Sequence, residues 1–121
     1  IKLYFSRLAS NKDENPVVFQ IKEYLHQNYA VPSLSVPDIS EHVRLSPTYV
    51  CTLFKNETGQ TLNQYLTDYR IKMSKQFLSD PLYKITDISA KVGYSDGNYY
   101  SKAFRKIVGL SPSEYREKML R

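Results

Sequence analysis

Apolar residues recur along this chain at intervals of three and four positions, the spacing that places them on one face of an α-helix. Capping residues or Pro mark the starts of these segments, and Gly or Pro marks most of their ends. The predicted helices cover residues 16–29, 35–43, 46–58, 61–78, 85–92, 95–108 and 111–121. No stretch alternates apolar and polar residues for long enough to predict a strand. The sequence therefore predicts an all-α fold of about seven helices.

Short polar side chains at the helix starts strengthen this prediction. Three pairs have the spacing of a capping box, in which each residue's side chain binds the other's backbone N–H: Ser35 with Asp38, Thr61 with Gln64, and Ser111 with Glu114. We also expect Ser46 and Ser95 to be N-caps, with Asp96 favoured by the helix dipole. In the helix that starts at Ser95, the spacing of Tyr100, Ala103, Phe104 and Ile107 predicts one apolar stripe.

The second half of the chain repeats the first. Asp38, Ile39, Ser40, Val43 and Ser46 recur as Asp87, Ile88, Ser89, Val92 and Ser95, and Tyr49, Phe54, Gly59 and Tyr65 recur as Tyr99, Phe104, Gly109 and Tyr115. Each copy has a short helix, a tight turn, a second helix with an apolar inner and a polar outer face, and a capped third helix. This layout is typical of helix-turn-helix units.

The repeat predicts four segments. They are the end of an upstream helix with a linker (1–15), a first helix-turn-helix unit (16–60), a connecting helix (61–79) and a second unit (80–121). Residues 61–78 would span roughly 27 Å, against ~34 Å between successive major-groove faces of DNA. The connecting helix carries a stripe predicted to be core: Leu62, Tyr65, Leu66, Tyr69, Met73 and Phe77. Arg70 has two open interpretations, a phosphate contact or a pair with an internal acid.

Charge adds a preference for a polyanionic partner. The 121 residues carry a formal net charge of +5, and residues 84–121 contain eight Lys or Arg against four Asp or Glu. Cys51 is the only cysteine, which excludes an internal disulfide and a Cys-based zinc site. No apolar run approaches the length of a membrane span, and no signal peptide is evident, so we expect a cytoplasmic protein without membrane contact. The missing Met and the helical spacing of Ile1, Tyr4, Phe5 and Leu8 suggest a piece of a longer chain.

Enzyme chemistry has no support in the sequence. His26 and His42 have no Cys or carboxylate at a spacing typical of a metal or nucleophile site, and the four glycines form no phosphate-binding motif. We therefore expect no catalysis, no metal and no cofactor. Paired helices also build protein-binding solenoids, but these need three or more repeats. Nucleic-acid binding is favoured over the alternative of a helical protein-interaction adaptor.

Two long runs resemble one known family. Residues 85–116 read ITDISAKVGYSDGNYYSKAFRKIVGLSPSEYR, and residues 38–66 read DISEHVRLSPTYVCTLFKNETGQTLNQYL. The first resembles the signature of the AraC-type bacterial transcription regulators, and the second resembles that family's first helix-turn-helix. The resemblance implies sequence-specific binding to double-stranded DNA, with both second helices in the major groove. It also implies RNA polymerase as a partner of the full regulator, and a sensor domain or two-component receiver domain upstream in the same chain.

The outward positions of the two second helices are the candidate DNA contacts. Near the helix starts, the expected base-reading residues are Thr48, Cys51, Thr52, Gly97, Asn98, Ser101 and Lys102. Further round or at helix N-termini, the expected phosphate contacts are Ser46, Lys55, Ser95, Arg105 and Lys106. Thr52 stands where many family members carry Arg, and Cys51 is also unusual. We therefore expect the first unit to contribute thymine contacts and positioning more than guanine recognition.

Overall fold

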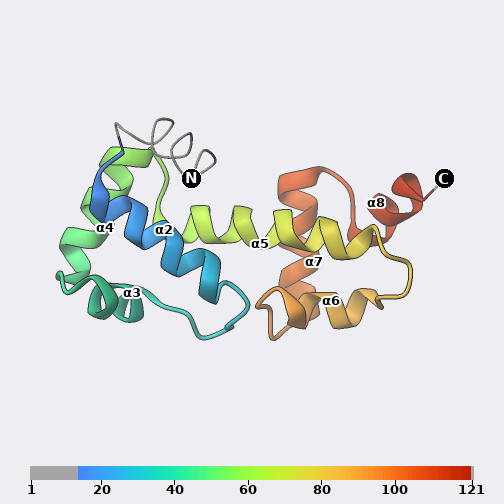
Figure 1. The fold of residues 1–121 in the computed structure, drawn as a ribbon. Helices are drawn as coiled ribbons and strands as arrows, with labels where there is room; N and C mark the ends of the chain where they lie inside the picture. The colour runs from blue at the N-terminus through green and yellow to red at the C-terminus, as the bar shows by residue number, and fades with distance from the viewer. Residues whose placement is uncertain (1–13, 121) are drawn as a thin grey trace, which may run out of the picture.

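Seven α-helices make up most of residues 14–120, the part of the chain that the computed structural model describes (Figure 1). They are α2 (Pro16–Asn28), α3 (Val36–Val43), α4 (Pro47–Thr58), α5 (Leu62–Leu78), α6 (Ile85–Lys91), α7 (Gly97–Val108) and α8 (Pro112–Met119). These residues contain no strand, which confirms the all-α prediction. The helical spacing noted at Ile1, Tyr4, Phe5 and Leu8 lies outside the described residues. The helices form two groups at the two ends of α5.

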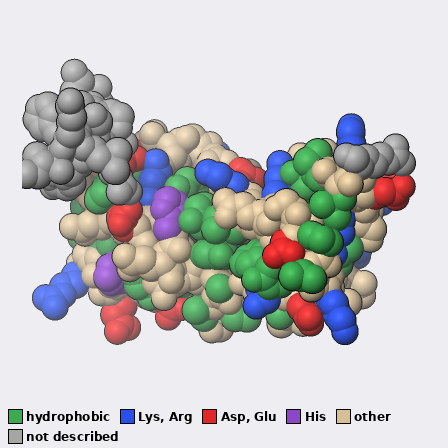
Figure 2. Space-filling model, turned by 45° about the vertical axis from the view of Figure 1, so that its right-hand side comes forward, with side chains coloured by type: hydrophobic (Ala, Val, Ile, Leu, Met, Phe, Trp, Pro, Cys, Tyr) green, Lys and Arg blue, Asp and Glu red, His purple; other side chains and the backbone are tan. Residues whose placement is uncertain are grey.

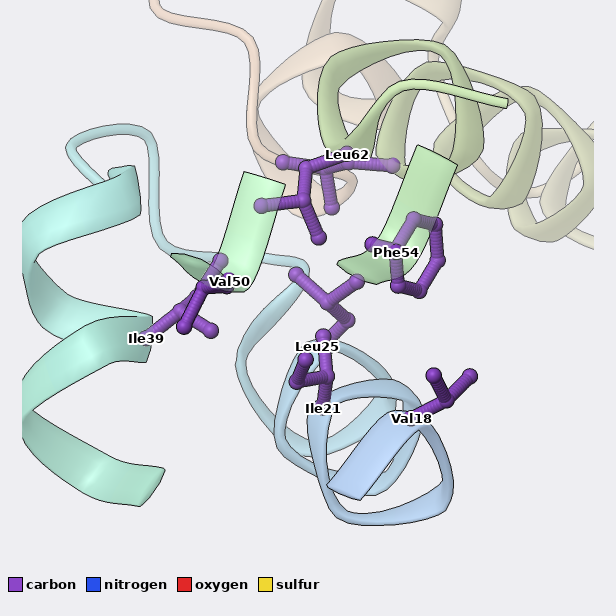
Figure 3. Packing of buried hydrophobic residues seen from close by; sticks show 8 residues of the cluster. Val18, Ile21, Leu25, Ile39, Val50, Phe54 and Leu62 are labelled. Carbon is purple, nitrogen blue, oxygen red and sulfur yellow. The ribbon is translucent and has the colours of Figure 1, made fainter. Parts of the chain in front are cut away.

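The first group packs around α2. Val18, Ile21 and Leu25 lie on one face of that helix and are almost completely buried. They meet side chains from three other helices, as Figure 3 shows: Ile39 of α3, Val50 and Phe54 of α4, and Leu62 of α5. The apolar residues spaced three and four positions apart in α2 therefore form the face that packs against the rest of this unit.

The second group packs around the other half of α5. Its core contains six almost completely buried side chains from α5, α6, the C-cap of α6 and α7: Ile71, Leu78, Ile88, Val92, Tyr100 and Phe104. Each buried position on α7 lies 50 residues after one on α4, since Tyr100 follows Val50 and Phe104 follows Phe54 by that interval. The two units are thus built on the same plan, as the repeat predicted.

Helix α5 is shared by the two cores, and this corrects the single stripe expected along it. Leu62 and Leu66 are buried in the first core, whereas Ile71, Ser74 and Leu78 are buried in the second. At 100° per residue, these two sets lie roughly 130° apart around the helix. The predicted core residues Tyr65, Tyr69, Met73 and Phe77 are only partly buried. Tyr65 packs at the margin of the first core, and Met73 and Phe77 pack at the margin of the second.

Most predicted helix caps are confirmed, and one is wrong. The Thr61–Gln64 and Ser111–Glu114 boxes form with both reciprocal hydrogen bonds at 2.8–3.1 Å. However, the N-cap of α7 is Asp96 and not Ser95, because a carboxylate oxygen of Asp96 accepts a hydrogen bond from the Asn98 backbone N–H at 2.8 Å. The extra residue of the second copy lies in the turn before α7, so Asp96 occupies the place that Ser46 has before α4.

Candidate nucleic-acid interface

Helices α4 and α7 are structural equivalents. Each has 12 residues, begins after a side chain that accepts a backbone hydrogen bond, and ends at a Gly in the left-handed conformation. These glycines are Gly59 and Gly109, with φ angles of 80° and 89°. Only Gly adopts this conformation without strain, so both helices end where the repeat predicts.

All twelve predicted contact residues are exposed. Ten of them lie on α4 and α7, Ser46 is the N-cap of α4, and Ser95 precedes the N-cap of α7. The expected base-reading set is Thr48, Cys51, Thr52, Gly97, Asn98, Ser101 and Lys102, and the expected phosphate set is Ser46, Lys55, Ser95, Arg105 and Lys106. The structure therefore groups these residues on the solvent-facing surfaces of two equivalent helices and just before their N-terminal ends. A hydrogen-bonding or cationic side chain at such a position is accessible to a large ligand.

Three of the expected phosphate contacts have intramolecular partners. The Nζ of Lys55 donates to the carbonyl oxygen of Gly59 at 3.2 Å, and so binds the end of its own helix. Arg105 and Glu114 form an exposed ion pair at 3.7 Å. The hydroxyl of Ser46 accepts the N–H of Tyr49 at 3.1 Å, which leaves its own proton available to an anion. The Lys55 and Arg105 interactions lie at the surface, where they exchange readily for contacts with a ligand.

Two exposed tyrosines on these helices were missed in the choice of contact residues. Tyr49 on α4 is 50% exposed and Tyr99 on α7 is 68% exposed. They occupy equivalent positions of the two copies, so the repeat itself was the signal that could have found them. Both helices therefore carry an exposed tyrosine side chain at the same position of the repeat.

Ile107 is an exception to the predicted buried stripe of α7. Its side chain is 43% exposed. It lines a hollow of about 590 Å³ between α7 and the first turns of α5, opposite Asn63, Gln64 and Thr67. The spacing of three and four correctly placed Tyr100 and Phe104 in the core, but Ile107 lies beyond the edge of that core and faces the polar side of α5.

Among the described residues Arg70 pairs with backbone groups and not with an acid, which was one of the two roles expected for it. Its guanidinium donates hydrogen bonds to the backbone carbonyl oxygens of Tyr29 and Val31 at 2.8 and 2.9 Å. Burial lowers the pKa of Arg70, and the nearby Tyr94 opposes this effect. Backbone groups are the partners because α5 brings Arg70 against the end of α2.

Charge does not single out a binding surface on the face that Figure 2 shows. On the face shown in Figure 2, Lys and Arg side chains are spread among Asp and Glu around a group of hydrophobic side chains. Within residues 14–120, no cluster of His, Cys, Asp and Glu has the arrangement of a metal site. No helix in the described part of the chain is long and apolar enough to cross a membrane. The candidate interface is defined by the equivalence of α4 and α7.

Known proteins share both the sequence pattern and the fold. The Msm operon regulatory protein of Streptococcus mutans is 36% identical over 110 residues, which are 91% of this chain and 39% of that protein. The transcriptional regulatory protein HptR of Staphylococcus aureus is 35% identical over 111 residues, covering 92% of this chain and 43% of that protein. The C-terminal domain of AraT, a response regulator from Geobacillus stearothermophilus, matches with a TM-score of 0.84 at 28% identity over 88% of each chain.

These comparisons define a family. The protein-family description "Helix-turn-helix domain" matches residues 39–118, which include both equivalent helices. The chain spans about two fifths of the length of the two curated relatives. With the motifs of both copies, the two-unit fold and relatives that are regulatory proteins, the chain belongs to the AraC-type family of helix-turn-helix DNA-binding domains of transcription regulators.

Proposed function

We propose that the chain reads one DNA duplex with α4 and α7 in two successive major grooves. The observation that carries this proposal is the equivalence of the two helices, which share length, caps and buried positions and present polar outer faces. A major groove about 12 Å wide accepts one such helix. Two joined units then cover more base pairs than either unit alone, which increases both affinity and specificity.

The proposed base contacts differ between the two helices. On α7, Asn98 and Lys102 offer donors that suit adenine and guanine edges, with Ser101 and the small Gly97 beside them. On α4, the methyl groups of Thr48 and Thr52 suit thymine, and Cys51 lies between them in sequence. We therefore assign stronger sequence readout to the second unit.

The proposed phosphate contacts surround these positions. Arg105 and Lys106 lie a turn further along α7, and Lys55 is the counterpart of Arg105 on α4. Ser46 caps α4, and Ser95 precedes the cap of α7. To this set we add the hydroxyl groups of Tyr49 and Tyr99, because tyrosine is among the side chains that bind phosphate oxygens in DNA complexes.

The rest of the regulator is proposed from the family. The division into an upstream segment (1–15), two units (16–60 and 80–121) and a connecting helix (61–79) follows the repeat. The relatives are longer than this chain, and we propose that a sensor or receiver domain precedes it in the same protein. RNA polymerase is the proposed partner of that full regulator, and the cytoplasm is its proposed compartment.

Selection of bound duplexes from a random pool tests the proposal. Two conserved blocks of base pairs, about one helical turn apart, are expected among the winners. A salt titration on the winning duplex should then show affinity falling steeply as salt rises, because phosphate contacts release counterions. Binding that yields no preferred sequence would contradict the proposal. Absence of any salt-dependent binding would favour a protein-interaction adaptor.

A further inference from the structure

Arg70 lies near the middle of α5 and contacts both helix-turn-helix units. Its Nε donates a hydrogen bond to the carbonyl oxygen of Tyr29 at 2.8 Å, and an Nη donates to that of Val31 at 2.9 Å. The guanidinium carbon lies 5.5 Å from the ring centre of Tyr94, which belongs to the α6–α7 turn. One side chain therefore joins the end of α2 in the first unit to the turn of the second.

The backbone of Gly93 approaches the same carbonyl group. A Cβ atom at this position would lie 2.4 Å from the Tyr29 oxygen and 2.7 Å from the Arg70 Nε. Gly93 is buried, and its φ of 98° also favours Gly. The turn of the second unit thus packs directly against the end of α2, where the two loops meet in Figure 1.

Tyr29 extends this contact into both cores. Its ring packs against the first and the second hydrophobic cluster, and it meets the ring of Tyr69 edge to face at 5.2 Å. Burial raises the pKa of Tyr29 and lowers that of Arg70, as expected where water is partly excluded. Hydrogen bonds to backbone carbonyls are stronger in such surroundings.

Helix α5 by itself leaves the angle between the units adjustable. Long helices bend gently, and each unit packs on a different face of α5, so a small rotation of one unit changes the angle between α4 and α7. The contacts of Arg70 and Gly93 lie to one side of the α5 axis. They form a second connection between the units, and two separate connections hold an angle that one does not.

We propose that Arg70 is a positioning residue for DNA recognition, which locks the α6–α7 turn onto the end of α2 and so holds α4 and α7 at one angle and spacing. This inference rests on the proposed function, because a fixed angle matters only when both helices read one duplex. If α4 and α7 are held rigidly, then once one of them is bound in its groove the other is at a high effective concentration near the next groove of the same duplex. Arg70 acts here without touching DNA.

Spin labels test the angle without DNA. Cys51 on α4 is exposed and supplies one label, and Ser101→Cys at the equivalent position of α7 supplies the other. With Arg70 intact, we expect one narrow distance distribution. Arg70→Ala should broaden it, and Arg70→Lys, which keeps the charge but loses the fork of two donors, should give an intermediate width. An unchanged distribution in Arg70→Ala overturns the proposal, whatever the DNA results are.

Arg116 provides a matched control. Its guanidinium also donates to two backbone carbonyl oxygens, those of Leu78 and Asp80, at 3.0 and 3.1 Å. These bonds join α8 to the end of α5 and to the loop after it, so they lie within the second unit. Arg116→Ala should lower the melting temperature but leave the label distance unchanged. If it broadens the distribution as much as Arg70→Ala does, the effect is general loosening and the proposal is wrong.

A second experiment measures the consequence for DNA. The duplexes are the selected one with both base-pair blocks and two versions in which one block is scrambled. Arg70→Ala should lose roughly tenfold or more in affinity for the intact duplex and less than about twofold for either single-block duplex. Gly93→Ala should show the same pattern through an independent change at the contact. Equal losses on all duplexes overturn the proposal.

The two experiments separate the inference from the proposed function. If the unaltered chain selects no duplex with two blocks, the proposed function fails, and the spin-label distances still decide whether Arg70 holds the units together. If the two blocks are found but Arg70→Ala keeps both the narrow distances and the affinity, the proposed function stands and the inference fails.

Discussion

Arg44 and Gly93 occupy the same place in the two tight turns, and both have a positive φ, of 59° and 98°. Their surroundings differ. Arg44 is exposed, whereas Gly93 is buried against Tyr29 and Arg70. A left-handed backbone costs a non-glycine residue about 1–2 kcal/mol. The first unit therefore carries strain in its turn that the second unit avoids.

Arg44→Gly should raise the free energy of unfolding by about 0.5–1 kcal/mol. The variant removes the left-handed strain, and the greater freedom of Gly in the unfolded chain offsets part of that gain. Gly93→Ala should have the opposite sign and cost about 2 kcal/mol or more, since the new Cβ collides with the Tyr29 carbonyl. Urea unfolding of the three proteins measures both values. A destabilised Arg44→Gly would contradict the strain argument.

Lys102→Ala and Asn98→Ala should each cost about 1–3 kcal/mol in binding to the selected duplex and relax one base position of it. Both side chains are exposed and outside the core, so the melting temperature should change little. The measurement is fluorescence anisotropy on the selected and a scrambled duplex. Lys118→Ala, which removes an exposed cation from α8, is the matched control and should leave the preference between these duplexes unchanged. Equal weakening on both duplexes by Lys102→Ala would show that α7 reads no bases.

Arg105→Ala should weaken binding to all duplexes alike and reduce the slope of affinity against salt by about one. The reason is that a phosphate contact carries no sequence information and releases counterions. The ion pair with Glu114 is exposed and contributes little to stability, so the fold should be unaffected. Anisotropy at several salt concentrations checks this. A loss confined to the selected duplex would instead make Arg105 a base contact.

Tyr100→Phe should leave the free energy of unfolding unchanged or raise it by about 1 kcal/mol. The Tyr100 side chain is 1% exposed, and its hydroxyl lies close to the Ser74 hydroxyl but makes no hydrogen bond of good geometry among the described residues. The nearby Ser74 hydroxyl donates to the Ile71 carbonyl oxygen. A buried hydroxyl without a partner costs free energy, and Phe removes it at nearly constant volume. Tyr99→Phe, at an exposed position, is the control and should change stability little; a clear loss in Tyr100→Phe would reveal a partner.

Glu114 predicts a pH dependence at the start of α8. Hydrogen bonds from the Ser111 backbone and side chain lower the pKa of the Glu114 carboxyl below its usual value of 4.5, and Arg105 adds to this. A lowered pKa means that the contribution to stability is complete above the unfolded value and is lost as pH falls through the folded value. The difference in melting temperature between the wild type and Glu114→Gln should therefore be constant near neutral pH and shrink below about pH 4.5. A difference independent of pH would contradict this assignment.

The sequence by itself determined the features that depend on neighbours along the chain. Capping boxes such as Thr61–Gln64 join residues three positions apart, and the period of three and four places Tyr100 and Phe104 on one face. The outer faces of α4 and α7 follow from the same period, so the exposed candidate contacts could be chosen without the structure. Even at this local level, Ser95 and Asp96 were both suitable caps, and only the geometry of the turn selected Asp96.

The tertiary structure decided how the two units are joined. Arg70 binds carbonyl groups 41 and 39 residues earlier in the chain, and no periodicity connects such positions. The change of buried face along α5, from Leu66 to Ile71, likewise depends on where the second unit packs. Ile107 has the spacing of a core residue but lies outside the core, which again depends on how the second unit packs. Helical periodicity specifies which side of a helix is apolar, whereas the relative position of two packed units depends on contacts that form only when the whole chain has folded.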